Sequence, residues 1–180
     1  MSTSENARTV LEQADIARAL TRISHEILES NKGPDDLMVL GIPTRGVTLA
    51  ERIGAQLAEI SGRPVPVGAL DVTMYRDDLH RHPTRTPHAT QIPPGGIDGK
   101  TVILADDVLF SGRSIRAALD ALSDIGRPAA VRLAILVDRG HRELPIRPDF
   151  VGKNLPSARH ERVQVRLVEV DGVDEVTIAS

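Results

Sequence analysis

Apolar side chains recur along the chain at two periods, and these periods predict alternating helices and strands. Helical spacing of apolar positions, as at Ile16, Leu20 and Ile23, predicts amphipathic helices over residues 15–30, 46–60 and 114–122. Shorter apolar runs predict buried strands over residues 37–42, 65–75, 101–104 and 131–137. Residues 163–170 and 176–178 are expected to pair as a terminal hairpin that turns at Asp171 and Gly172.

This alternation is typical of an α/β fold with a mostly parallel central sheet flanked by helices. A chain of 180 residues suits one domain, so we expect residues 1–180 to form a single unit. Residues 74–98 interrupt the pattern with four prolines and many polar side chains, which predicts a flexible loop, and residues 138–162 are expected to be irregular. Ligands of parallel sheets bind beyond the carboxyl ends of the strands, so the residues that follow each strand matter most.

Composition removes several classes of function. No apolar run approaches the roughly 18 residues that a membrane-spanning helix needs, so we expect no membrane partner and a cytoplasmic location. The chain has no cysteine, which excludes disulfides and thiolate metal sites. Its formal net charge of −3 argues against a general nucleic-acid coat and leaves only a local basic patch. Aromatic residues make up 2%, which disfavours RNA recognition by base stacking.

The strongest candidate for chemistry is the run over residues 102–114, where an apolar strand ends in Asp106 and Asp107. The following turn, residues 111–114, opens a helix, and free N–H groups at a helix N-terminus suit a phosphate. Gly112 permits a close backbone approach. Carboxylates at the same edge accept hydrogen bonds from a vicinal diol and favour a divalent cation. Each residue alone fits an exposed acid or a helix cap equally well, but the whole run predicts a site for a ribose phosphate with Mg²⁺.

This run closely resembles the motif by which type I phosphoribosyltransferases bind 5-phosphoribosyl-1-pyrophosphate (PRPP). The resemblance implies that Asp106 and Asp107 are catalytic, hold the ribose hydroxyls and contact, indirectly, the Mg²⁺ that accompanies the substrate. It implies that the residues after them bind substrate, with the 5-phosphate at the end of the run: Val108, Leu109, Phe110, Ser111, Gly112, Arg113 and Ser114.

Four further segments, residues 41–46, 72–78, 137–147 and 151–154, are similar to the bifunctional pyrimidine operon regulators and uracil phosphoribosyltransferases of the PyrR family. That family implies a type I phosphoribosyltransferase fold with a flexible loop over about 74–98 and a small hood over about 138–162. It also implies conversion of uracil and PRPP to UMP and pyrophosphate, binding of a pyrimidine-operon mRNA leader stem-loop under nucleotide control, and a homodimer or higher oligomer.

The same resemblance assigns further substrate contacts. Position alone leaves Arg45 evenly balanced between a solvated turn and a pyrophosphate ligand, and Arg76 could be part of a plain ion pair. The family places both in the catalytic site, and it adds substrate-binding residues after two strands: Thr44, Arg45 and Gly46, and Val137, Asp138 and Arg139. Phe110 stands where the family more often has Tyr. Purine phosphoribosyltransferases usually carry an acid there, so Phe110 weakens the case for a purine substrate.

A candidate RNA surface rests on weaker patterns. Arg18, Thr21 and His25 lie opposite the apolar stripe of the first helix, which by itself indicates only a solvated face. Residues 138–162 contain six basic and four acidic side chains, a local net charge of +2 that is also common in solvated loops. The family resemblance places five residues in the RNA surface: Thr21, His25, Arg142, Arg147 and Lys153.

Three functions therefore remain open at this point. The first is an enzyme and RNA regulator in one chain. The second is an RNA-binding regulator whose catalytic site survives only as a nucleotide sensor. The third is a salvage phosphoribosyltransferase for another base, which Phe110 and the basic stretch disfavour.

Overall fold

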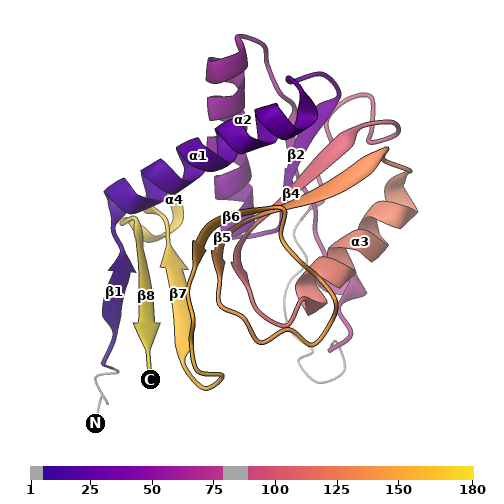
Figure 1. Ribbon diagram of the computed structural model, residues 1–180. Coiled ribbons are helices and arrows are strands. Elements are labelled where there is room, and N and C mark those ends of the chain that lie inside the picture. Colours follow the sequence, from indigo (N-terminus) through magenta and orange to yellow (C-terminus); the bar gives the residue numbers. More distant parts are fainter. Residues whose placement is uncertain (1–5, 79–88) are drawn as a thin grey trace.

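The computed structural model describes residues 6–78 and 89–180 (Figure 1). Five strands form the central sheet, and all neighbouring pairs are parallel. In spatial order they are β3 (Val67–Ala69), β2 (Leu37–Gly41), β4 (Thr101–Leu109), β5 (Ala130–Asp138) and β6 (Phe150–Asn154). The expected α/β class with a parallel sheet flanked by helices is confirmed.

Helices cover both faces of this sheet, and strand alternation explains which face each helix covers. Val39 and Ile103 point to the face covered by α1 (Gln13–Asn31) and α2 (Arg45–Ser61). Their strand neighbours point the other way and pack with α3 (Arg113–Ile125) in a second apolar cluster. The central strands are thus buried on both faces, as their continuous apolar runs require.

A second, three-stranded antiparallel sheet lies beside the central one, with strand order β1 (Arg8–Leu11), β8 (Glu175–Ala179) and β7 (Arg162–Arg166) (Figure 1). The expected pairing of the last two strands is confirmed by the β7–β8 ladder. The expected tight turn is wrong, because the short helix α4 (Val168–Asp171) joins these strands and ends at Gly172. Acidic side chains of α4 pair with arginines of α2, which is far away in the sequence, so strand patterning did not reveal this helix.

Three other sequence expectations need correction. Residues 65–75 do not form one strand, because β3 ends at Ala69 and a 3-10 turn, η1 (Thr73–Tyr75), follows. Strand β4 continues past Leu104 to Leu109, since β5 supplies ladder partners for all of its residues except Asp107. The stretch expected to be irregular contains β6, a short edge strand of the sheet.

The described part of the chain has no helix long and apolar enough to cross a membrane. The expected flexible loop is described only at its two ends, and residues 79–88 lie outside the described residues. The expectation of a single domain with a hood over about 138–162 stays a prediction.

Candidate active site

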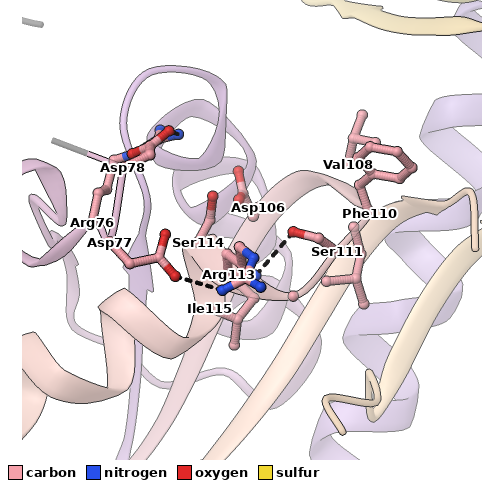
Figure 2. A pocket seen from close by; sticks show the side chains of 12 residues that line it. Arg76, Asp77, Asp78, Asp106, Val108, Phe110, Ser111, Arg113, Ser114 and Ile115 are labelled. Carbon is pink, nitrogen blue, oxygen red and sulfur yellow. Dashed lines mark hydrogen bonds and ion pairs between the residues drawn. The ribbon is translucent and has the colours of Figure 1, made fainter. Parts of the chain in front are cut away.

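The sheet creates a crevice between β2 and β4. The chain leaves β2 toward β3 on one side, and it leaves β4 toward β5 on the other. Loops that diverge in this way at the carboxyl ends of parallel strands form the usual ligand site of such folds. A cavity of about 260 Å³ lies at the carboxyl end of β4 (Figure 2). Of the predicted PRPP residues, its lining contains Arg76, Asp106 and residues 108–114 but not Thr44, Arg45, Gly46 or Asp107. The full lining is Arg76, Asp77, Asp78, Asp106, Val108, Leu109, Phe110, Ser111, Gly112, Arg113, Ser114 and Ile115.

The turn over residues 111–114 has the shape of an anion cradle. Helix α3 begins at Arg113, and its N-cap Gly112 has a positive φ of 92°. A Cβ at Gly112 would lie 3.1 Å from the side chain of Ile146, so both the backbone conformation and the available space favour glycine. The Ser111 hydroxyl accepts a hydrogen bond from the Arg113 amide at 3.2 Å. The first N–H groups of a helix have no partner within the helix, so the start of α3 can donate to a phosphate bound in the cavity that it lines.

The two adjacent carboxylates on β4 have different surroundings. Asp106 lines the cavity, whereas Asp107 does not, because consecutive residues of a strand face opposite sides. The Asp107 amide donates to Asp106 Oδ1 at 2.9 Å, and the Val108 amide donates to Asp107 Oδ1 at 2.8 Å. The structure therefore brings Asp106 to the cavity and turns Asp107 toward the other face of β4.

Burial raises the pKa of the Asp106 carboxyl well above its usual range, and the nearby negative charge of Asp107 raises it further. A cation or a hydroxyl donor that enters the cavity would stabilise the ionised form of the Asp106 carboxyl. Asp106 is thus poised to interact with a ligand that brings both.

The loop between β2 and α2 packs directly against the end of β4. The Ile42 amide donates to the Ala105 carbonyl at 3.0 Å, and the peptide bond between Pro43 and Thr44 is cis. A Cβ at Gly46 would lie 2.6 Å from the Ala105 carbonyl oxygen and 3.3 Å from Asp106 Oδ1. Glycine at position 46 is therefore what lets this loop reach the crevice.

We expect Gly46→Ala to lower the rate of the predicted reaction with PRPP by roughly 10-fold, because the added methyl must push the start of α2 away from β4 and misplace the loop. Steady-state kinetics on purified protein would measure the effect. Gly62→Ala is a suitable control for α2, since a Cβ there meets no atom within 4 Å, although its φ of 74° makes alanine mildly strained. Unchanged kinetics in a folded Gly46→Ala protein would place the loop outside the site.

The arginines expected to bind the phosphate groups of PRPP all have acidic partners. Arg76 pairs with Asp78, with both nitrogen–oxygen distances at 3.0 Å. Arg113 Nη1 lies 2.6 Å from Asp77 Oδ2. Arg76 and Arg113 line the cavity together with these carboxylates (Figure 2), so an arriving polyphosphate would compete with them for the guanidinium groups.

Arg45 lies apart from that cavity lining and forms a two-pronged ion pair with Asp171. Its Nε and Nη2 lie 3.0 and 2.7 Å from the two carboxylate oxygens. This hydrogen bonding raises the pKa of Arg45 and lowers that of Asp171. Sequence reasoning missed Asp171, because 126 residues separate it from Arg45 and no motif contains both.

The residues after β5 line a second, smaller cavity of about 200 Å³ at the ends of β5 and β6. Its walls are Asp138, Arg139, Gly140, Asn154, Leu155 and Pro156. Of the predicted base-site residues, Val137 is fully buried within the sheet and does not reach it. The Phe110 ring belongs to the wall of the first cavity, and the Arg139 guanidinium lies over that ring at 4.2 Å. The Phe110–Arg139 contact therefore connects the two cavities.

Arg142 has an internal role that its sequence position did not reveal. It donates to the Phe110 carbonyl at 2.9 Å, to the Ile146 carbonyl at 2.8 Å and to the Asp138 carboxylate at 2.6 Å. These contacts tie the segment after β5 to the end of β4. The i, i+4 spacing of Asp138 and Arg142 was the one available signal, outside a helix where that spacing carries little weight.

Three of the five predicted RNA residues share one surface. Thr21 and His25 are exposed on α1, and Lys153 is exposed on β6, which packs against α1. Arg22 joins the two elements by donating to the carbonyls of Val151 and Gly152 at 3.2 and 2.6 Å. Arg142 bonds to Phe110 and Asp138, which line the two cavities, and its predicted role in RNA binding stays a prediction.

Arg147 is exposed in the segment that precedes β6, and within the described residues no polar contact links it to α1. The five predicted RNA residues therefore fall into two groups. Thr21, His25 and Lys153 lie on α1 and β6, whereas Arg142 and Arg147 lie in the segment between β5 and β6.

Comparison with known proteins assigns the family. The model of the phosphoribosyl transferase domain matches residues 6–169. The chain is 72% identical over 176 residues to the "Bifunctional protein PyrR" of Leifsonia xyli subsp. xyli, which covers 95% of this chain and 96% of that protein. It is 64% identical to the protein of the same name from Streptomyces coelicolor, with 98% and 91% covered.

Solved structures agree on the fold. Hypoxanthine phosphoribosyltransferase from Trypanosoma cruzi, solved with its product IMP, superposes with a TM-score of 0.73 at 13% identity and covers 100% of this chain and 97% of that one. At such low identity the likeness concerns the fold alone. The identity to the two bacterial proteins extends over nearly every element described above, and so the chain belongs to the phosphoribosyltransferase family and, within it, to the bifunctional PyrR proteins.

Proposed function

We propose that this protein transfers the phosphoribosyl group of PRPP to uracil, giving UMP and pyrophosphate, and that it binds a pyrimidine-operon mRNA leader under the control of uridine nucleotides. The observation that carries the proposal is the 72% identity to a bifunctional PyrR protein over nearly the whole chain, combined with a cavity lined by the PRPP motif. We further propose a cytoplasmic homodimer or larger oligomer.

The residues around the first cavity suggest one orientation for PRPP, which is part of the proposal. The 5-phosphate lies at the start of α3, where Ser111, Gly112 and Ser114 supply amide and hydroxyl donors. The ribose hydroxyls then lie toward Asp106, which accepts their hydrogen bonds in its ionised form. The pyrophosphate extends toward Arg76 and the loop that contains Thr44 and Arg45. Both guanidinium groups are paired with a carboxylate, Asp78 or Asp171, and keep further N–H donors for a phosphate.

Mg²⁺ that arrives with PRPP fits this donor set. Among the described residues, no group of three or more histidine, aspartate or glutamate side chains could hold a metal by itself. Mg²⁺ is commonly held by one or two carboxylates together with substrate phosphates. Asp106 provides a carboxylate at the cavity, with Asp107 beside it. When bound, the ion would neutralise charge on the leaving pyrophosphate.

The second cavity is the proposed site for uracil. It opens beside Phe110, Asp138 and Arg139, and its walls include backbone groups after β5 and β6 that suit the donor and acceptor pattern of a pyrimidine edge. No carboxylate occupies position 110 to serve as a base for a purine ring.

The chemistry is a displacement at the anomeric carbon of the ribose. The bond from this carbon to the pyrophosphate oxygen breaks, the bond to uracil N1 forms, and the N1 proton is released. Because the leaving group departs with its charge, the protein contributes mainly through orientation and electrostatic stabilisation by Arg45 and Arg76.

The direct test is incubation of the protein with PRPP, Mg²⁺ and each free nucleobase in turn. We expect UMP and pyrophosphate with uracil and no nucleotide with hypoxanthine, guanine or adenine. The sensor alternative instead predicts no turnover with any base while UMP still changes the affinity for leader RNA. A purine nucleotide product would refute the assignment of uracil.

A further inference from the structure

Asp171, in the C-terminal helix α4, approaches the proposed pyrophosphate site through Arg45. The Asp171 carboxylate accepts hydrogen bonds from Arg45 Nε at 3.0 Å and from Arg45 Nη2 at 2.7 Å. It also accepts one from the Leu167 amide at 2.8 Å. Its side chain is 17% exposed and that of Arg45 is 30% exposed. The pair is therefore partly shielded from solvent. The hydrogen bond from the Leu167 amide holds the Asp171 carboxylate in place independently of Arg45.

The geometry of this pair leaves one edge of Arg45 for a second anion. A guanidinium has five N–H donors in a rigid fork. Two of them, on Nε and Nη2, meet Asp171, so the Nη1 edge has no acidic partner within the described part of the chain. Arg45 is the first residue of α2 and belongs to the loop expected to bind pyrophosphate, and the charge of Asp107 also raises the pKa of its guanidinium.

We propose that Asp171 is a positioning residue that holds the Arg45 guanidinium with its Nη1 edge toward the pyrophosphate of PRPP. This inference rests on the proposed function of Arg45. Asp171 does not contact substrate itself. The ion pair with Asp171 fixes the orientation of the long Arg45 side chain. Less conformational entropy of Arg45 is therefore lost when the pyrophosphate binds.

A neighbouring ion pair provides an internal comparison. Arg52, seven residues beyond Arg45 on the same face of α2, lies 2.8 Å from both oxygens of Asp174. Asp174, like Asp171, accepts a backbone N–H, that of Val168, at 2.7 Å. Both carboxylates thus connect residues 171–174 to helix α2 through an arginine. Only the Asp171 pair lies at the start of α2.

The test compares Asp171→Asn with Asp174→Asn. We expect Asp171→Asn to raise the KM for PRPP roughly 10-fold and to weaken inhibition by pyrophosphate by a similar factor. Asp174→Asn removes one of the two carboxylates that bind Arg52, whose other partner Glu169 remains, and should leave both constants within about 2-fold. Asp171→Glu keeps the charge and should restore part of the affinity. If both Asn variants change KM equally, Asp171 only holds α4 in place and the proposal fails.

A double-mutant cycle identifies the route of the effect. In an Arg45→Ala background, Asp171→Asn should produce no further decrease in PRPP affinity, because the residue through which it acts is gone. Additive decreases would overturn the proposal. Binding of PRPP with Mg²⁺ by calorimetry keeps this outcome separate from the proposed enzyme activity: wild-type protein that binds PRPP but does not turn over uracil would refute the activity alone. Unchanged PRPP affinity in Arg45→Ala would remove Arg45, and with it Asp171, from the site.

Discussion

Asp106→Asn should lower kcat/KM for PRPP by on the order of 10²-fold, since it removes a charge that the bound substrate requires, and the same change should raise the thermal midpoint of the empty protein. The two effects have one cause. Burial and the charge of Asp107 disfavour the ionised carboxyl in the folded protein and raise its pKa. An uncharged amide of the same shape avoids that cost, but it cannot serve a cation or accept from two hydroxyls as well as a carboxylate does.

The pH dependence distinguishes this explanation from a general packing effect. A folded-state pKa above the unfolded one means that Asp106 contributes stability at low pH and that this contribution is lost as the pH rises through the raised pKa. The stability gap between Asp106→Asn and wild type should therefore be small in acid and widen toward neutral pH. PRPP affinity of the wild type should fall as acid protonates the carboxyl, and the Asn variant should lack that component.

Thermal unfolding across pH and calorimetric titration with PRPP and Mg²⁺ measure both trends. Asp120→Asn, on the exposed face of α3, controls for the removal of one negative charge and should change neither trend. A destabilised Asp106→Asn protein, or one with wild-type kcat/KM, would contradict the assignment of Asp106.

The parts of the site that the sequence predicts well are those whose residues are close along the chain. Strand β4, its acids and the turn into α3 lie within one short run, and the local rules for strand ends and helix starts place Asp106, Gly112 and Ser114 around one cavity. The same rules could not show that Asp107 faces away, because that depends on β4 continuing as a regular strand to Leu109.

The parts that sequence could not predict depend on interactions between distant segments. Arg45 was recognisable as a candidate cation, but its partner Asp171 lies in a helix whose sequence resembles part of a hairpin. In the sequence, Arg142 does not differ from the other basic residues of its segment. The structure shows that it bonds to Phe110 and Asp138, which line the cavities. Strand β6 was missed because its second half, Gly-Lys-Asn, is polar at the edge of the sheet.

The separation of the five predicted RNA residues leads to a second prediction with a large effect. The hydrogen bond from the Glu12 amide lowers the pKa of the Asp15 carboxyl most, and the charges of Arg18 on α1 and Lys153 on β6 lower it further. These two cations therefore lie on the α1–β6 surface that also presents Thr21 and His25. With few aromatic residues in the chain, RNA binding should depend on charge and hydrogen bonds. The double variant Arg18→Glu, Lys153→Glu should weaken leader RNA binding by on the order of 10²-fold at low salt, because two cations that neutralise phosphates are replaced by groups that repel them.

Gel-shift titrations across salt concentrations, paired with the uracil assay, test this surface. The slope of log K against log salt should become shallower by about 0.7 for each single-stranded phosphate that the variant no longer neutralises, while turnover of uracil stays near that of wild type. Lys100→Glu with Arg127→Glu makes the same change in net charge near the amino ends of β4 and β5 and should have a much smaller effect.

Arg142→Ala should show the opposite pattern, with lower turnover of uracil and an unchanged salt slope, because its guanidinium is engaged at the cavities. The same gel-shift and enzyme assays measure both properties on one preparation of each variant. If Arg142→Ala weakens RNA binding and the α1–β6 double variant does not, the RNA surface lies on the segment after β5 and the assignment to α1 and β6 is wrong.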